Sequence, residues 1–124
     1  MKWRVYIAGK VGNETVSLTD EEHQEAVDKF RRIERELLNA GFETRNPMNF
    51  VPKDVVNWQE AMKLCIPELC KCNALYLIHD FKESKGAMME YTIANKLGFR
   101  LITPDVVEEQ IRINKDKHQF IQQD

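Results

Sequence analysis

The chain has 124 residues, a formal net charge of −2 and a pI of about 5.9. This slightly negative charge argues against binding to polymeric nucleic acid, because proteins that bind it are usually strongly basic. The length suits one domain over residues 1–124 with a real hydrophobic core. No apolar run approaches the roughly 18 residues that a membrane helix needs, so we expect no membrane partner.

The amino-terminal residues, the cysteines and the absence of common motifs bear on location, metal binding and cofactor binding. The first ten residues, MKWRVYIAGK, are too polar for a signal peptide, so we expect a cytoplasmic protein. Cys65, Cys70 and Cys72 lack a usual zinc spacing, and we expect reduced thiols and no metal site. The chain contains no G-x-G-x-x-G, P-loop, H-E-x-x-H or G-x-S-x-G motif, and we expect no cofactor.

The first predicted strand is the short apolar run 3–8, which ends at Gly9. A capping-box pattern formed by Thr19 and Glu22 then predicts the start of a helix, and Gly41 predicts its end. Apolar residues recur between these signals at helical spacing: Ala26, Phe30, Ile33 and Leu37.

The second strand and helix follow the same order. Residues 42–46 form a candidate strand that Pro47 stops. A second helical stripe follows: Trp58, Ala61, Met62, Cys65 and Leu69. Pro67 should kink or restart this helix, because proline removes a backbone hydrogen bond.

The last two strands and helices complete the alternation. Residues 74–78 (ALYLI) form a continuous apolar run, as expected of a strand buried on both faces. A helix is predicted over 86–97, and a fourth strand over 99–103. Pro104 suits the first position of a last helix, at about 105–117.

This βαβαβαβα pattern predicts an α/β fold, a single-domain flavodoxin- or Rossmann-like three-layer sandwich. We expect a parallel sheet of four or five strands in the order 2-1-3-4. Ligands of such sheets bind beyond the carboxyl ends of the strands, where the strand order reverses. The loop that holds Gly9 and Lys10 and the loop 79–86 should therefore form the binding site.

One acidic residue stands out in the predicted helix 86–97. At 100° per residue, Glu90 falls near the centre of the apolar face. That face consists of Ala87, Ile93, Ala94 and Leu97. A desolvated carboxylate in a cleft can act as a nucleophile or general base. The alternative is a buried ion pair with Lys10 or Lys85.

Five further residues have a functional and an ordinary interpretation. Ser84 and Gly86 stand at a helix start that favours an anion; in the ordinary interpretation Ser84 is only the N-cap. Asp80 follows the third strand and would supply a second carboxylate near a glycosidic bond, or be an ordinary loop residue. Tyr6 ends the first strand; either its hydroxyl points toward the switch point, or its ring is an ordinary core aromatic. Asn46 ends the second strand, where a turn residue is expected anyway.

Four segments together resemble a known family: VYIAGK, the NP after the second strand, WQEAM, and CNALYLIHDFKESKGAMMEYTIANKLG. Residues 3–103 resemble small nucleoside 2-deoxyribosyltransferase-like proteins, in a phage- and prophage-associated branch of uncharacterised function. The resemblance implies that Glu90 is a nucleophile that attacks the anomeric carbon of a 2-deoxyribosyl group and expels the base. It implies that Tyr6 orients Glu90, and that Ser84 and Gly86 hold a 5′-phosphate.

The sequence departs from the pattern of this family at one position. The family usually has an aspartate at the start of the third strand, which assists proton handling at the base; here this residue is Asn73, which cannot donate a proton as an acid does. The implied function is cleavage or transfer at the N-glycosidic bond of a 2′-deoxynucleoside or its 5′-monophosphate. The implied partners are that small molecule and further copies of the chain in a homo-oligomer. The alternative is a catalytically weak nucleotide-binding or interaction protein of the same fold.

Overall fold

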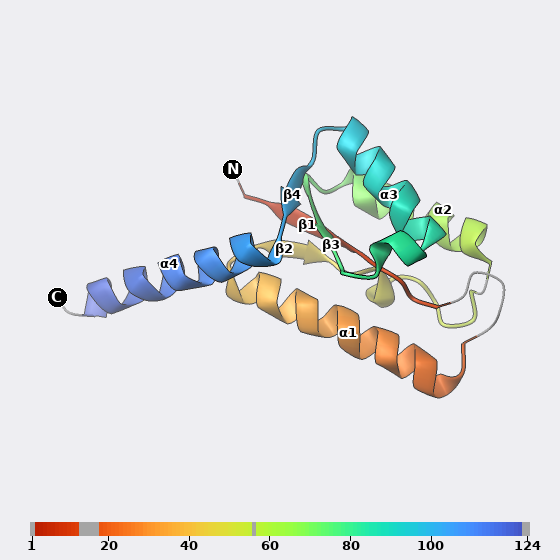
Figure 1. The fold of residues 1–124 in the computed structure, drawn as a ribbon, viewed down its shortest axis with the longest axis horizontal. Helices are drawn as coiled ribbons and strands as arrows, with labels where there is room; N and C mark the ends of the chain where they lie inside the picture. The colour runs from red at the N-terminus through yellow and green to blue at the C-terminus, as the bar shows by residue number, and fades with distance from the viewer. Residues whose placement is uncertain (1, 13–17, 56, 123–124) are drawn as a thin grey trace.

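The computed structural model describes residues 2–12, 18–55 and 57–122, with side chains as far as residue 117. Its centre is one parallel sheet of four strands in the order β2-β1-β3-β4, with helices on both faces (Figure 1). The predicted α/β fold and strand order are therefore confirmed. The strands are β1 (Arg4–Ala8), β2 (Glu43–Arg45), β3 (Ala74–Leu77) and β4 (Arg100–Ile102).

The helices are α1 (Asp20–Asn39), α2 (Trp58–Cys70), α3 (Lys85–Lys96) and α4 (Pro104–Gln122), with the short 3₁₀ turns η1 (Pro47–Asn49) and η2 (Phe81–Glu83). The capping box at the start of α1 is confirmed, because Thr19 and Glu22 each accept a hydrogen bond from the other's backbone N–H. Gly41 follows α1 with φ of 90°, a left-handed conformation that favours glycine.

The structure corrects two helix predictions in part. α2 runs through Pro67 to Cys70 without restarting. Pro67 lies near the carboxyl end of α2 and is exposed, so few helical hydrogen bonds depend on it and water can replace the missing one. α4 ends at Gln122 rather than near residue 117, since no glycine or proline stops it, and it extends past the end of α1 (Figure 1).

The strands divide the core between two helical layers. Successive side chains of a strand point to opposite faces of a sheet. Val5 and Ile7 of β1 accordingly pack with α1 and the start of α4, whereas Tyr6 and Ala8 pack with α2 and α3. Tyr6 is fully buried. The alternation therefore aims the Tyr6 side chain at the layer that contains Glu90.

The carboxyl ends of β1 and β3 meet at one edge of the sheet. Ala8 pairs with Leu77, and the N–H of Ile78 donates to the carbonyl of Ala8 at 2.8 Å. Gly9 comes next, and a Cβ atom there would lie 2.8 Å from the Ile78 side chain, so this close approach requires glycine. The loops after β1 and β3 therefore lie together, at the predicted switch point.

Among the described residues, none of the helices combines the length and apolar character needed to cross a bilayer.

Candidate functional site

Glu90 is a buried carboxyl group on α3, with 5% of its surface exposed. Its inward direction is as the helical spacing predicts. The Tyr6 hydroxyl on β1 donates a hydrogen bond to Glu90 Oε2. Within the described part of the chain Glu90 forms no ion pair: Lys10 lies 3.7 Å from Glu83 instead, and Lys85 lies over the ring of Trp58.

The charge state of this buried pair follows from its surroundings. Burial raises the pKa of Glu90 to about 8, although the hydrogen bond from Tyr6 favours the carboxylate. Burial, then the nearby Glu90 charge, raises the pKa of Tyr6 well above its usual value. Tyr6 therefore remains a hydrogen-bond donor throughout the physiological range, and Glu90 is poised to gain or lose a proton near neutral pH.

Cys65 on α2 is a third member of the cluster; the sequence analysis placed it in an apolar stripe and among the expected reduced thiols, but not in the site. Its thiol is buried beside Tyr6 and close to Glu90. Burial, together with the Glu90 charge, raises the pKa of Cys65 to about 12. Cys65 is therefore a neutral thiol that packs behind the pair.

Glu90 lines a cavity beyond the carboxyl edge of the sheet, which we call the switch-point cavity. Its volume is about 160 Å³, several times what one water molecule needs, so it can admit part of a small organic ligand. Its walls come from the loop after β1, α1, the segment between β2 and α2, the start of α2 and the start of α3. The lining residues that matter below are Gly9, His23, Trp58, Ser84, Gly86 and Glu90.

The first turn of α3 forms one wall. Ser84 Oγ accepts a hydrogen bond from the N–H of Ala87 at 3.1 Å, so Ser84 is the N-cap of the helix. The N–H of Gly86 belongs to the first turn, which has no intrahelical acceptor for it, and Gly86 lines the cavity. A Cβ atom at Gly86 would lie 3.1 Å from Met62 Sδ, so the chain approaches α2 closely here.

Asp80 lies outside the described lining of the cavity. Its carboxylate accepts hydrogen bonds from the backbone N–H of Lys10 at 2.9 Å and from Lys29 Nζ at 2.5 Å. Burial alone would raise the pKa of Asp80, but these hydrogen bonds and the Lys29 charge outweigh it and lower the pKa. Asp80 is therefore a held carboxylate that fixes the loop after β1.

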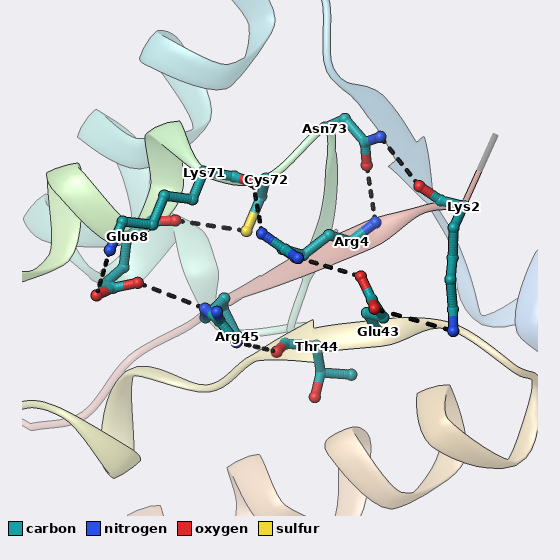
Figure 2. Close-up of polar contacts among 9 residues, drawn as sticks. All are labelled: Lys2, Arg4, Glu43, Thr44, Arg45, Glu68, Lys71, Cys72 and Asn73. Atoms are coloured by element: carbon teal, nitrogen blue, oxygen red, sulfur yellow. Dashed lines mark hydrogen bonds and ion pairs between the residues drawn. The ribbon is translucent and has the colours of Figure 1, made fainter.

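Asn73 lies at the opposite edge of the sheet from Glu90. It precedes β3, where its side chain accepts from the Arg4 N–H at 2.8 Å and donates to the Lys2 carbonyl at 3.3 Å. Figure 2 shows this contact within a polar network that also includes Glu43. A strand of 4 residues spans roughly 13 Å. The structure therefore does not bring Asn73 to the cavity.

Asn46 is also outside the described lining, but it supports one wall. It is buried and caps η1, accepting from the N–H of Met48 at 3.0 Å, and its amide donates to Glu34 at 3.4 Å. Met48 and the adjacent Pro47 line the cavity.

The structure thus brings together Tyr6, Gly9, Ser84, Gly86 and Glu90. It also adds cavity residues that sequence reasoning did not select, among them His23 and Trp58. Trp58 stood in a predicted apolar stripe, so its spacing indicated only packing. His23 carries no motif, and only the path of α1 past the sheet edge reveals its position.

Comparison with protein families gives one match. Residues 3–103 match the model of a domain of unknown function, DUF4406. The matched range contains β1, α3 and every residue of the switch-point cavity named above. A search of curated proteins returned no match.

Proposed function

The chain belongs to the DUF4406 family, and we propose that it breaks or transfers the N-glycosidic bond of a 2′-deoxynucleoside or its 5′-monophosphate, with Glu90 as the nucleophile. The observation that carries the proposal is the buried Glu90 carboxyl group, hydrogen-bonded by Tyr6, on the wall of a cavity at the topological switch point. The resemblance of residues 3–103 to deoxyribosyltransferase-like proteins supports the same chemistry.

In the proposed reaction, the ionised Glu90 carboxylate forms a bond to the anomeric carbon as the bond to the base nitrogen breaks. Water or a second base then attacks the glycosyl-enzyme and releases the carboxylate. With a pKa of about 8, roughly a tenth of the molecules carry the reactive carboxylate at pH 7. Its removal from water strengthens its attraction to the positive charge that develops on the sugar.

Tyr6 has a positioning role in this reaction. Its hydrogen bond fixes one oxygen of Glu90 and favours the ionised form. The other oxygen, Oε1, has no hydrogen-bond partner among the described residues, which leaves it for the sugar. A fixed carboxylate lowers the entropy cost of reaching the transition state.

The first turn of α3 favours a phosphate group on the substrate. Helix amino termini attract anions through unpaired N–H groups and the helix dipole. Gly86 has no side chain to block an approach to this turn, and it lies one turn before Glu90 on the same helix. A 5′-monophosphate bound there would place its sugar next to the carboxylate.

The test is base release, measured by chromatography over a panel of 2′-deoxynucleosides and their monophosphates. Glu90→Gln should lower the rate at least about a thousandfold on any substrate that the wild type cleaves. Glu108→Gln is the matched control, because Glu108 is exposed on α4 away from the cavity. Base release that survives Glu90→Gln removes Glu90 from the mechanism.

One observation favours a second function, nucleotide binding without turnover. The described lining of the cavity holds one carboxylate, since Asp80 and Asn73 both lie elsewhere. Thermal shift separates the two functions: a melting temperature raised by deoxynucleotides, with no base released, supports binding alone.

A further inference from the structure

Breaking an N-glycosidic bond requires help at the base as well as at the sugar. The base departs with the bonding electron pair, and a proton supplied to it makes it a far better leaving group. Two residues that the sequence analysis considered near the base, Asp80 and the Asn73 that replaces the usual aspartate, do not line the described cavity. Asp80 is held as a carboxylate by Lys10 and Lys29, and Asn73 lies at the other edge of the sheet.

The described lining of the switch-point cavity contains three titratable side chains: His23, Lys53 and Glu90. Lys53 is exposed and its ammonium group binds Asp20. Glu90 is the proposed nucleophile. His23 is therefore the remaining candidate for proton transfer, and imidazole is the side chain best suited to that role at neutral pH.

The position of His23 suits the task. It lies one turn inside α1, in the helical layer opposite α3, so His23 and Glu90 line the same cavity from two different layers. Its side chain is half-buried, and its ring nitrogens have no hydrogen-bond partner among the described residues. A ligand in the cavity would thus meet the carboxylate and the imidazole on separate sides.

A charged group also lies close to His23. Asp20, on the same helix, interacts electrostatically with His23. The ammonium group of Lys53, from the segment before α2, is paired with Asp20.

We propose that His23 is the general acid that protonates the departing base. This inference rests on the function proposed above. In the first step, Glu90 bonds to the anomeric carbon, the electron pair of the broken bond goes to the base, and the His23 imidazolium gives the base its proton. In the second step, water attacks the anomeric carbon, Glu90 leaves as a carboxylate, and neutral His23 takes the proton of the water.

The test compares two substrates that differ in their need for a proton. One is 2′-deoxyguanosine 5′-monophosphate, or whichever natural deoxynucleotide the wild type cleaves fastest. The other is the 7-methylated 2′-deoxyguanosine 5′-monophosphate, whose base already carries a positive charge and departs neutral. His23→Gln should lower kcat about a hundredfold or more on the natural substrate and less than about threefold on the methylated one.

Two controls accompany the comparison. His23→Asn, a second variant, should repeat the pattern, and thermal melts of both variants establish that they fold. Glu25→Gln should leave both rates unchanged, because Glu25 is exposed on α1 outside the described cavity lining.

The outcomes separate this inference from the proposed function. An active wild type, with equal losses or no losses on the two substrates in the His23 variants, overturns the role of His23 alone. A wild type that cleaves neither substrate overturns the proposed function and the role of His23 with it.

Discussion

Tyr6 and Glu90 are 84 positions apart in the sequence, yet the Tyr6 hydroxyl on β1 donates a hydrogen bond to the Glu90 carboxyl group on α3. The sheet makes this possible, because β1 is a central strand. The Tyr6 side chain lies on the face of the sheet that is covered by α2 and α3. Burying two polar groups in the core costs stability unless they are hydrogen-bonded. Proteins tolerate such a cost at sites where function requires it.

Removal of the Tyr6 hydroxyl should raise the pKa of Glu90. Tyr6→Phe deletes the hydrogen bond that favours the carboxylate, so the pKa moves above its value of about 8. Carbon NMR of ¹³C-labelled glutamate carboxyl groups measures this titration directly. Base release at pH 7 should fall by about tenfold to a hundredfold. Tyr91→Phe is the control, because Tyr91 packs against Phe81. An unchanged Glu90 pKa in Tyr6→Phe would contradict the role of this hydrogen bond.

Glu90 should make the protein less stable as the pH rises. The unfolded chain loses this proton near pH 4.5, whereas the folded protein holds it until about pH 8. The free energy of unfolding should therefore fall between these values and remain low above them.

Glu90→Gln removes this dependence. The variant should be more stable than the wild type by roughly 2–5 kcal/mol at pH 9, and nearly equal to it at pH 4. Urea unfolding at the two pH values measures the difference. An equal stability change at both pH values would show that the carboxyl group is not held protonated.

Asp80 should stabilise the loop after β1 through its contacts with Lys10 and Lys29. Asp80→Asn keeps the side-chain shape but removes the charge, and should lower the free energy of unfolding at pH 7 by about 1–3 kcal/mol. The pKa of Asp80 is lowered in the folded protein, so its contribution is present above the ordinary pKa of 3.8. It is lost as the pH falls through the lower, folded value. Wild type and variant should thus converge in acid, and a gap that persists below pH 2 would count against this ion pair.

A methyl group at Gly86 should weaken phosphate recognition. The Cβ atom of Gly86→Ala would lie 3.1 Å from Met62 Sδ and would crowd the first turn of α3. KM for deoxynucleoside monophosphates should rise about tenfold, whereas KM for the nucleosides should change little. Steady-state kinetics on matched pairs measures this, and an equal rise for both would show that no phosphate binds at this turn.

The fold followed from local signals, because each one depends on neighbours in the sequence. The capping box at Thr19, the continuous apolar run of β3 and the inward face of Glu90 are all readable without tertiary contacts. The partners of Glu90 are different, since they depend on which face of β1 meets α3.

The positions of Asn73 and Asp80 relative to the cavity could not be predicted from the residue types alone. Asn73 starts a parallel strand, and strand starts lie at the edge away from the switch point, so topology alone could have excluded it from the cavity. Asp80 is at the correct edge, but Lys29, 51 positions away, holds it. Long-range pairing of this kind has no local signal.

The central claim is that Glu90 attacks the sugar. The most direct test is mass spectrometry of protein quenched during reaction with a 2′-fluorinated arabinosyl nucleotide, whose fluorine slows breakdown of a glycosyl-enzyme. We predict a covalent sugar phosphate on the peptide that carries Glu90, and none in Glu90→Gln. Base release by the wild type with no adduct on this peptide, and undiminished in Glu90→Gln, would contradict it.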